Sequence, residues 1–393
     1  YYDSVNTRWE YIAADEANRI VLENGELKLQ SADAGSADGA ITWNEKLKMT
    51  VGGDFKIGAP AGIGITISSS GNVDSIGIIT ATSFNGTLAT AAQTNITSVG
   101  TLTGLTVSAN SIINGINVGK GANSASGNTA LGDNALDDNV TGTNNTAIGQ
   151  NVLTVLTTGT DNTSVGRNSL DADTTGGNNT AMGSGALSSN TTAHNNTAVG
   201  YIALNANTTG TRNTAVGGSA LDVNTTASDN TAVGQGSLGS NTTGDSNTAI
   251  GRASLNANTT TSYNTAVGAD ALASNTAAEM TAVGYQALNA NTTGIRNTAV
   301  GTYALDAVTT TNDNTALGYN ALTASTTGQN NTAVGRGALQ ASQSGSNNTA
   351  IGRLAMAGAN VTADNNVAIG YQALNANIGG AGNVALGTNA MVV

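Results

Sequence analysis

The sequence predicts an all-β protein in which residues 119–393 form a parallel β-solenoid of about 16 coils, preceded by small β modules. From Asn128 onward, a 17-residue pattern, N-T-A-V-G-x-x-A-L-x-x-N-T-T-G-x-x, recurs in sixteen copies. A fixed short period is typical of solenoids, in which each coil packs only on its neighbours. The repeat is rich in Thr, Asn and Gly, which are poor residues for helix interiors, so the coil must be built from strands. Both Trp and both Phe lie before residue 85, which leaves small aliphatic side chains for the core.

The first 60 residues differ in composition from the rest, because they hold ten of the 25 acidic residues and six of the 13 basic ones. Alternating strands on either side of Asn24-Gly25 predict a β-hairpin over residues 20–29, since Asn-Gly favours the two-residue hairpin turn. A second strand pair is expected through residues 41–43 and 46–51. We interpret residues 1–60 as a small β module, either for attachment or as a folded spacer, and residues 61–118 as an irregular β shaft or linker.

The period is 17 residues in thirteen of the fifteen intervals between the central glycines of the repeat. One residue is missing between Gly268 and Gly284, where Met280 replaces the usual Asn, and one is added between Gly352 and Gly370. Both changes fall in the x-x-N-T-T-G-x-x half. This half is therefore predicted to be the tolerant, surface-exposed part of the coil.

Side chains alternate between the two faces of a strand, so Thr and Val of N-T-A-V-G share one face, and Asn and Ala share the other. The Gly that follows can turn the chain at positive φ. The second apolar position in each coil is Leu, replaced only by Met356 and Met391. We predict that Val and this Leu form the core, as in Val199, Leu204, Val216, Leu221, Val233 and Leu238.

The position before Val is Ala in fifteen copies and Ser164 in the other, which makes a stripe of small side chains along the solenoid. Such a stripe suits the close approach of another chain. We therefore predict a homo-oligomer, and a trimer is the simplest way for a rod to bury one stripe per subunit around a common axis. The predicted interface stripe includes Ala198, Ala215, Ala232, Ala249, Ala266, Ala282 and Ala299.

The last two copies, N-N-V-A-I-G at residues 365–370 and G-N-V-A-L-G at 382–387, resemble a known motif. They are similar to the N-S-V-A-I-G motif in the head domains of trimeric autotransporter adhesins. The resemblance implies a left-handed parallel β-roll that assembles as a trimer, with Val367 and Ile369 inside and Ala368 facing away. The family repeat is shorter than 17, and most copies here have Thr at the first Val of the motif, so handedness and strands per coil stay open.

Residues 62–118 resemble a second group of proteins through ITISSSGNV at 65–73, TATSFNG at 80–86 and NITSVGTLTGLTV at 95–107. Such stretches look like those in tail fibres of marine tailed phages. This resemblance implies a structural fibre on the virion, outside the cell, that reaches and attaches to a host by multivalent weak binding. Its partners would be a cell-surface receptor such as a glycan, together with other fibre or virion proteins. A cellular surface adhesin or extracellular filament subunit is the alternative.

Residues able to support catalysis are sparse, so the chain is predicted not to be an enzyme and to need no cofactor. His194 is the only histidine and falls in the variable part of a repeat, and there is no cysteine. The scattered Asp residues match no calcium-binding pattern, so no metal site is expected. Two alternatives remain: a groove of carboxylates from different coils, as in depolymerising tailspikes, and an ice-binding face made by the Asn-Thr-Thr row.

The residues that follow the central glycines differ most in chemistry from coil to coil. Tyr and Arg, which are common in recognition surfaces, recur there. They are a possible ligand-facing stripe or ordinary exposed turn residues: Tyr201, Tyr285, Tyr319, Tyr371, Arg167, Arg252, Arg336 and Arg353.

A formal net charge of −12 without a basic stripe makes nucleic acid an unexpected partner. No run of about 18 apolar residues is present, so insertion into a membrane is not expected. The chain begins with Tyr1-Tyr2 and has no signal-peptide pattern, which suggests a processed product or part of a longer polypeptide.

Overall fold

The computed structural model describes residues 2–3, 8–9, 17–32, 42–49, 51, 55–57, 65–67, 73–75, 111–113, 116–358, 362–376 and 379–392. The chain divides into two compact units, Tyr1–Leu102 and Thr103–Val393. Among the described residues, no helix is long and apolar enough to cross a membrane.

The N-terminal unit is antiparallel. Two short strands pair with each other, β1 (Tyr2–Asp3) and β2 (Arg8–Trp9). A six-stranded sheet then runs in sequence order through β3 (Ala17–Glu23), β4 (Glu26–Ala32), β5 (Asn44–Met49), β6 (Phe55–Ile57), β7 (Ile65–Ile67) and β8 (Val73–Ser75).

The predicted Asn-Gly hairpin is confirmed. Strands β3 and β4 pair antiparallel, and Asn24 and Gly25 have φ of 53° and 77°, as a two-residue turn with two left-handed positions requires. Of the second predicted strand pair, the strand over residues 46–51 is confirmed where β5 includes it, but its pairing is wrong, because β5 pairs with β4 and β6. Thr42 and Trp43 lie outside any strand, and Ile41 lies outside the described residues. The sheet also continues through β7 and β8, past residue 60, where the sequence suggested a boundary.

The C-terminal unit is a parallel β-solenoid with one three-residue strand per coil. It begins with a hairpin of β9 (Ser111–Ile113) and β10 (Ile116–Gly119), and β10 pairs antiparallel with β11. A short 3-10 helix, η1 (Ala122–Ser124), follows β10. The parallel strands are β11 (Thr129–Leu131), β12 (Thr146–Ile148), β13 (Thr163–Val165), β14 (Thr180–Met182), β15 (Thr197–Val199), β16 (Thr214–Val216), β17 (Thr231–Val233), β18 (Thr248–Ile250), β19 (Thr265–Val267), β20 (Thr281–Val283), β21 (Thr298–Val300), β22 (Thr315–Leu317), β23 (Thr332–Val334), β24 (Thr349–Ile351), β25 (Val367–Ile369) and β26 (Val384–Leu386).

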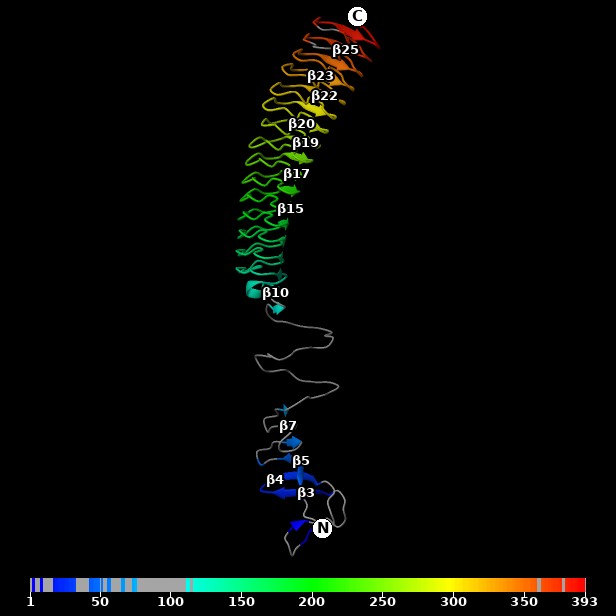
Figure 1. Ribbon diagram of the computed structural model, residues 1–393. Coiled ribbons are helices and arrows are strands. Elements are labelled where there is room, and N and C mark those ends of the chain that lie inside the picture. Colours follow the sequence, from blue (N-terminus) through cyan, green and yellow to red (C-terminus); the bar gives the residue numbers. More distant parts are fainter. Residues whose placement is uncertain are drawn as a thin grey trace. The chain divides into compact units, whose positions relative to one another are not determined.

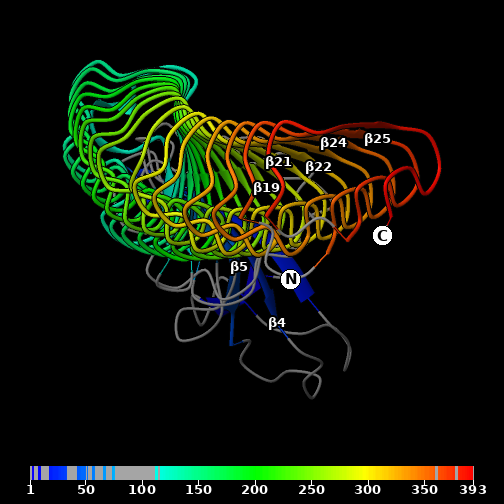
Figure 2. The ribbon, with the colours of Figure 1, turned by 90° about the horizontal axis from the view of Figure 1, so that it is seen from above.

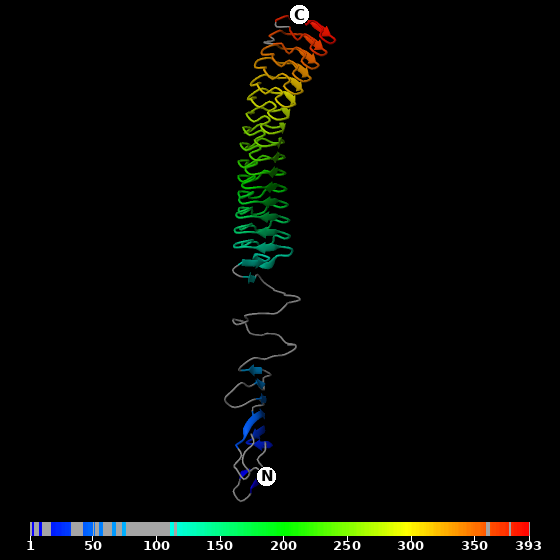
Figure 3. The ribbon, with the colours of Figure 1, turned by 45° about the vertical axis from the view of Figure 1, so that its right-hand side comes forward.

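The register between coils follows the sequence repeat. Each strand pairs with the strand 17 residues later, as Ala198 does with Ala215. The short repeat pairs Thr265 with Thr281, and the long one pairs Thr349 with Val367, so the length changes are absorbed between strands. Sixteen strands at a spacing of about 4.8 Å give a stack roughly 70 Å long. The coils rise in order from β11 to β26, and the stack bends toward its C-terminal end (Figures 1 and 3).

The strand alanines lie inside the coil and the strand valines outside, which reverses the predicted faces. Ala198 and Ala215 have no exposed surface, whereas Val199 and Val216 are half-buried on the outer side of the sheet. The predicted Ala stripe is therefore part of the core of a single chain and not an oligomer interface: Ala198, Ala215, Ala232, Ala249, Ala266, Ala282 and Ala299. The predicted core leucines Leu204, Leu221 and Leu238 are confirmed, and the predicted core residues Val199, Val216 and Val233 are wrong.

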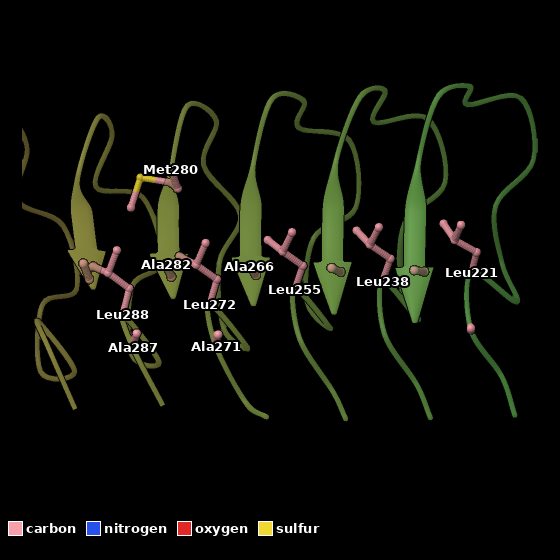
Figure 4. Packing of buried hydrophobic residues seen from close by; sticks show 14 of the residues in the cluster. Leu221, Leu238, Leu255, Ala266, Ala271, Leu272, Met280, Ala282, Ala287 and Leu288 are labelled. Carbon is pink, nitrogen blue, oxygen red and sulfur yellow. The ribbon is translucent and has the colours of Figure 1, made fainter. Parts of the chain in front are cut away.

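The reason for this arrangement is the narrow cross-section of the coil. Figure 4 shows Leu255, Leu272 and Leu288 in one row that packs against the strand alanines Ala266 and Ala282. A large side chain from one side of so thin a coil leaves room for only a small one opposite. The same reversal holds for Val367 and Ile369, which are half-buried and exposed, respectively, while Ala368 is buried.

The turns of each coil use left-handed backbone. The core Leu has positive φ in each coil, for example 53° at Leu204 and 52° at Leu221, which brings its side chain into the interior. The central Gly has φ near +130° throughout, for example 137° at Gly200. Seen from above, successive coils repeat one outline and drift sideways along the stack (Figure 2).

Two buried rows of asparagine tie neighbouring coils together. In the first row, the Asn145 backbone N–H donates to Asn128 Oδ1 at 2.8 Å, and Asn128 Nδ2 donates to the Gly142 carbonyl at 2.9 Å. In the second row, Asn207 Nδ2 donates to Asn190 Oδ1 and to the Gly210 carbonyl, both at 3.0 Å. Buried amides are stabilising where their polar groups are paired in this way.

The second Asn row corrects the prediction for the x-x-N-T-T-G-x-x half. Its Asn side chains are buried, and so is the Gly three residues later, as at Asn207 and Gly210, while the second Thr of the half is exposed. The first Thr of the pair bonds to the next coil, as Thr208 Oγ1 does to the Thr225 carbonyl at 3.0 Å. The second Thr of the pair, such as Thr209, Thr226 and Thr243, is exposed, so the row presents one exposed Thr per coil and the ice-binding alternative stays a prediction.

Candidate functional site

The outer surface of the parallel sheet runs along the solenoid from β11 to β26. It consists of the first and third residues of each strand from β11 to β26, which we call the Thr–Val face. The first residue is Thr in fourteen strands and Val in β25 and β26, and the third is Val, Ile, Leu or Met. Side chains such as Met182 (46% exposed) and Leu317 (47%) remain open to solvent in the single chain.

The Thr–Val face carries no charged residue over its sixteen strands. Protein surfaces normally intersperse charges of both signs, and contiguous exposed apolar patches mark interaction sites. Two rows of uncharged side chains in perfect register are therefore suited to packing against another flat surface.

A second surface follows the turn after the central Gly. All eight Tyr and Arg residues of the sequence-predicted stripe are exposed, from Tyr371 at 39% to Tyr201 at 66% among the tyrosines. The structure gathers only some of them. Tyr201 and Arg167 lie far along the stack from the rest, and Arg252 Nη2 pairs with Asp270 Oδ2 at 2.6 Å.

Six consecutive coils bring aromatic rings and guanidinium groups together. Tyr303 lies between Tyr285 and Tyr319, with ring centroids 5.5 Å and 6.4 Å apart and both pairs edge to face. Tyr303 was missed in the sequence because it stands one position later in its repeat than the other tyrosines. Counting both positions after each Gly would have found it.

Two arginines extend this row. The Arg336 guanidinium lies 5.9 Å from the Tyr319 ring centre, and that of Arg353 lies 5.4 Å from the Tyr371 ring centre. We call Tyr285, Tyr303, Tyr319, Arg336, Arg353 and Tyr371 the Tyr–Arg segment.

Other arginines on the solenoid have acidic partners in the next coil. Arg212 Nε is 2.6 Å from Asp229 Oδ1, and Arg296 Nε is 2.7 Å from Asp313 Oδ1. The hydrogen bond from Arg212 lowers the pKa of Asp229. Within the described residues, neither Arg336 nor Arg353 forms such an ion pair, although they occupy successive coils.

The second Asn row contains one buried carboxyl group. At Asp173, Oδ1 accepts the Gly176 N–H at 2.8 Å, and Oδ2 has no hydrogen-bond partner in the described part of the chain. Burial raises the pKa of Asp173 from 3.8 to about 7. In this row the amide of the following coil donates, and the hydrogen bond from the Asn190 side chain lowers the pKa of Asp173 by less than burial raises it.

The second Asn row is also interrupted at Val308, which replaces the usual Asn, and a stability prediction follows from this. Among the described residues, Asn291 Oδ1 has no hydrogen-bond partner, because Val308 stands where the next Asn would donate. We expect Val308→Asn to raise the free energy of unfolding by about 1 kcal/mol, since it pairs a buried acceptor with little change in volume. Urea denaturation measures this. The exposed Val223→Asn is the control and should change little, and a less stable Val308→Asn variant would refute the role of the row.

In the described ranges, His194 and the acidic residues are not grouped as a catalytic site would require. His194 is exposed and outside the strands, and its Nδ1 accepts the Gly177 N–H at 2.8 Å. Across the described part of the chain, no group of three or more His, Cys, Asp or Glu is placed to hold a metal ion.

No protein-family model matches the chain, and no curated protein or solved structure matches it. The function is therefore inferred from the two surfaces described above.

Proposed function

We propose that this chain is the subunit of an extracellular fibre, in which three copies pack side by side through their Thr–Val faces. The observation that carries the proposal is the absence of charge on this face over sixteen strands. The proposal keeps the trimer expected from the sequence and moves its interface from the alanines to the opposite side of the strand.

Association through this face removes apolar and β-branched side chains from water, which is favourable in proportion to the area buried. The face is only two side chains wide, because each strand has three residues and the middle one points inward. Three narrow faces fit around one axis that runs along the solenoid. A threefold axis in this direction places the copies parallel and in register, so each Thr meets the Thr of its own coil number.

A long, rigid rod with repeated surfaces suits reach and multivalent attachment. The resemblance of residues 62–118 to phage tail fibres and of the last repeats to adhesin heads supports attachment to a host cell or surface. The fibre would belong to a virion or, as the alternative, to a cell surface. No enzymatic step is proposed.

The interface is tested by replacing two valines of the Thr–Val face. We expect the wild-type chain to have three times its mass of 38.7 kDa by light scattering. The double variant Val216→Lys/Val233→Lys should have the mass of one chain, because each assembly would bring six ammonium groups together in a water-poor interface.

The matched control is Val140→Lys/Val223→Lys, which places two lysines at exposed valines outside the strands (55% and 38% exposed). This control should keep the wild-type mass. Circular dichroism would check that each variant is folded. A folded wild-type monomer would refute the proposal, and the free Thr rows would then be assayed for effects on ice growth.

A further inference from the structure

We infer that the Tyr–Arg segment is a binding site for an acidic polysaccharide that lies along the solenoid. The inference rests on the proposed attachment function and names the chemical class of its receptor. The segment spans the six coils that begin at the central glycines from Gly284 to Gly370, and each coil contributes one of its side chains.

The tyrosines supply flat apolar surface beside a hydroxyl group. Tyr285 and Tyr319 are 43% and 47% exposed, and Tyr303 holds the ring of each edge to face. This mutual packing fixes the rings before any ligand binds, which reduces the entropy lost on binding. The C–H face of a sugar ring packs on such an aromatic surface, and the phenol groups can bond to sugar hydroxyls.

The arginines supply the preference for negative charge. Arg336 and Arg353 are exposed neighbours in successive coils, and neither has an acidic partner among the described residues. The Arg336 guanidinium lies toward Tyr319 and that of Arg353 toward Tyr371, so each guanidinium can donate bidentate hydrogen bonds to a carboxylate or sulfate of its own, beside a tyrosine ring. The three Arg–Asp pairs elsewhere show that the repeat can place an acid beside an arginine, which makes this unpaired position distinctive.

The spacing and number of the charges favour a polysaccharide over other polyanions. The coils advance by about 4.8 Å, close to the length of one sugar ring, so successive side chains meet successive sugars. Two arginines beside four tyrosines suit a polymer that carries no more than one charge per sugar and whose sugar rings can pack on the tyrosines. Nucleic acid has a denser row of phosphates than two arginines can pair.

The test is calorimetric titration of the full chain with oligogalacturonate, with neutral dextran as the uncharged probe. We expect oligogalacturonate to bind, dextran to bind at least about tenfold more weakly, and binding to weaken in 1 M salt. Arg336→Gln/Arg353→Gln should lose about tenfold or more in affinity, and so should Tyr303→Ser, which removes the central ring.

The matched control is Arg252→Gln, which removes an exposed arginine from the same turn position where Asp270 already pairs with it. Its affinity should change less than about twofold. Absence of oligogalacturonate binding to the wild type, or an equal loss in the control, would overturn the inference. Light scattering on the same samples separates the two proposals: a trimer that does not bind refutes only the polysaccharide site, and a monomer refutes the assembly.

Discussion

Gly217→Ala is expected to destabilise the solenoid by at least about 3 kcal/mol, because the new methyl group meets backbone in the next coil. A Cβ at Gly217 would lie 2.6 Å from the Gly234 carbonyl oxygen and 2.7 Å from its carbonyl carbon. The φ of Gly217 is +136°, a conformation that L side chains rarely adopt. Neither problem is relieved by a rotamer change, since a methyl group has no alternative position and the atoms that it meets are backbone.

The neighbouring Gly218→Ala is a matched control within the same turn. A Cβ there meets nothing within 4 Å. We expect its urea denaturation curve to match the wild type within about 0.5 kcal/mol. If Gly217→Ala unfolds at the same urea concentration as Gly218→Ala, the close approach of successive coils at the central Gly is wrong.

The second large effect is a loss of folding stability as the pH rises through the pKa of Asp173. The pKa of this carboxyl group is about 7 in the folded chain, whereas its ordinary value is 3.8. Folding therefore favours the protonated form. Its contribution to stability is full below about pH 4, falls as the pH rises, and is lost above about pH 7. The difference between the two pKa values corresponds to roughly 4 kcal/mol.

Asp173→Asn should remove most of this pH dependence and stabilise the chain at pH 8. An amide stays neutral, and its NH2 group can donate to the Gly176 carbonyl as Asn207 Nδ2 does to that of Gly210. The reverse change, Asn190→Asp, should destabilise the chain at pH 8 and create a new pH dependence in the same direction. Urea denaturation at pH 4, 6 and 8 measures both, and a stability of the wild type that rises over this range would contradict the account.

The period, the strands and the Leu core could be predicted from the sequence because they depend on spacing and on the number of apolar positions. The alternation of side chains shows only that Ala and Val point to opposite sides of the strand, and it does not show which of them points into the core. The side-chain volumes tolerated at the two positions would have shown which one is buried. The Ala position accepts nothing larger than Ser164, which bonds to the facing Ser169 (Oγ–Oγ 2.6 Å), whereas the Val position takes Leu and Met182.

The two Asn rows were hidden for a different reason. Asn in Gly- and Thr-rich sequence is usually a turn residue at the surface. Here the coil buries it, because its amide bonds to backbone 17 residues away and to the neighbouring Asn. Such bonds depend on the stacking of whole coils.

The candidate site was partly predictable. The exposure of the eight Tyr and Arg residues followed from their place after the turn Gly. The cluster did not, because the Tyr303 contacts depend on which side chains of adjacent coils point along the stack. The Thr–Val face was identified in the sequence as one side of the strand and assigned to the wrong side of the coil.

Oxidative cross-linking tests the assembly most directly, because the natural chain has no cysteine. Thr214→Cys places one thiol on the Thr–Val face, and Thr226→Cys places one at an exposed position in the loop half of the same coil. In three parallel copies in register, the Thr214→Cys variant should form disulfide-linked pairs of chains in dilute solution, and the Thr226→Cys variant should stay unlinked. Linked pairs from Thr226→Cys alone, or from neither variant, would contradict an assembly through the Thr–Val face.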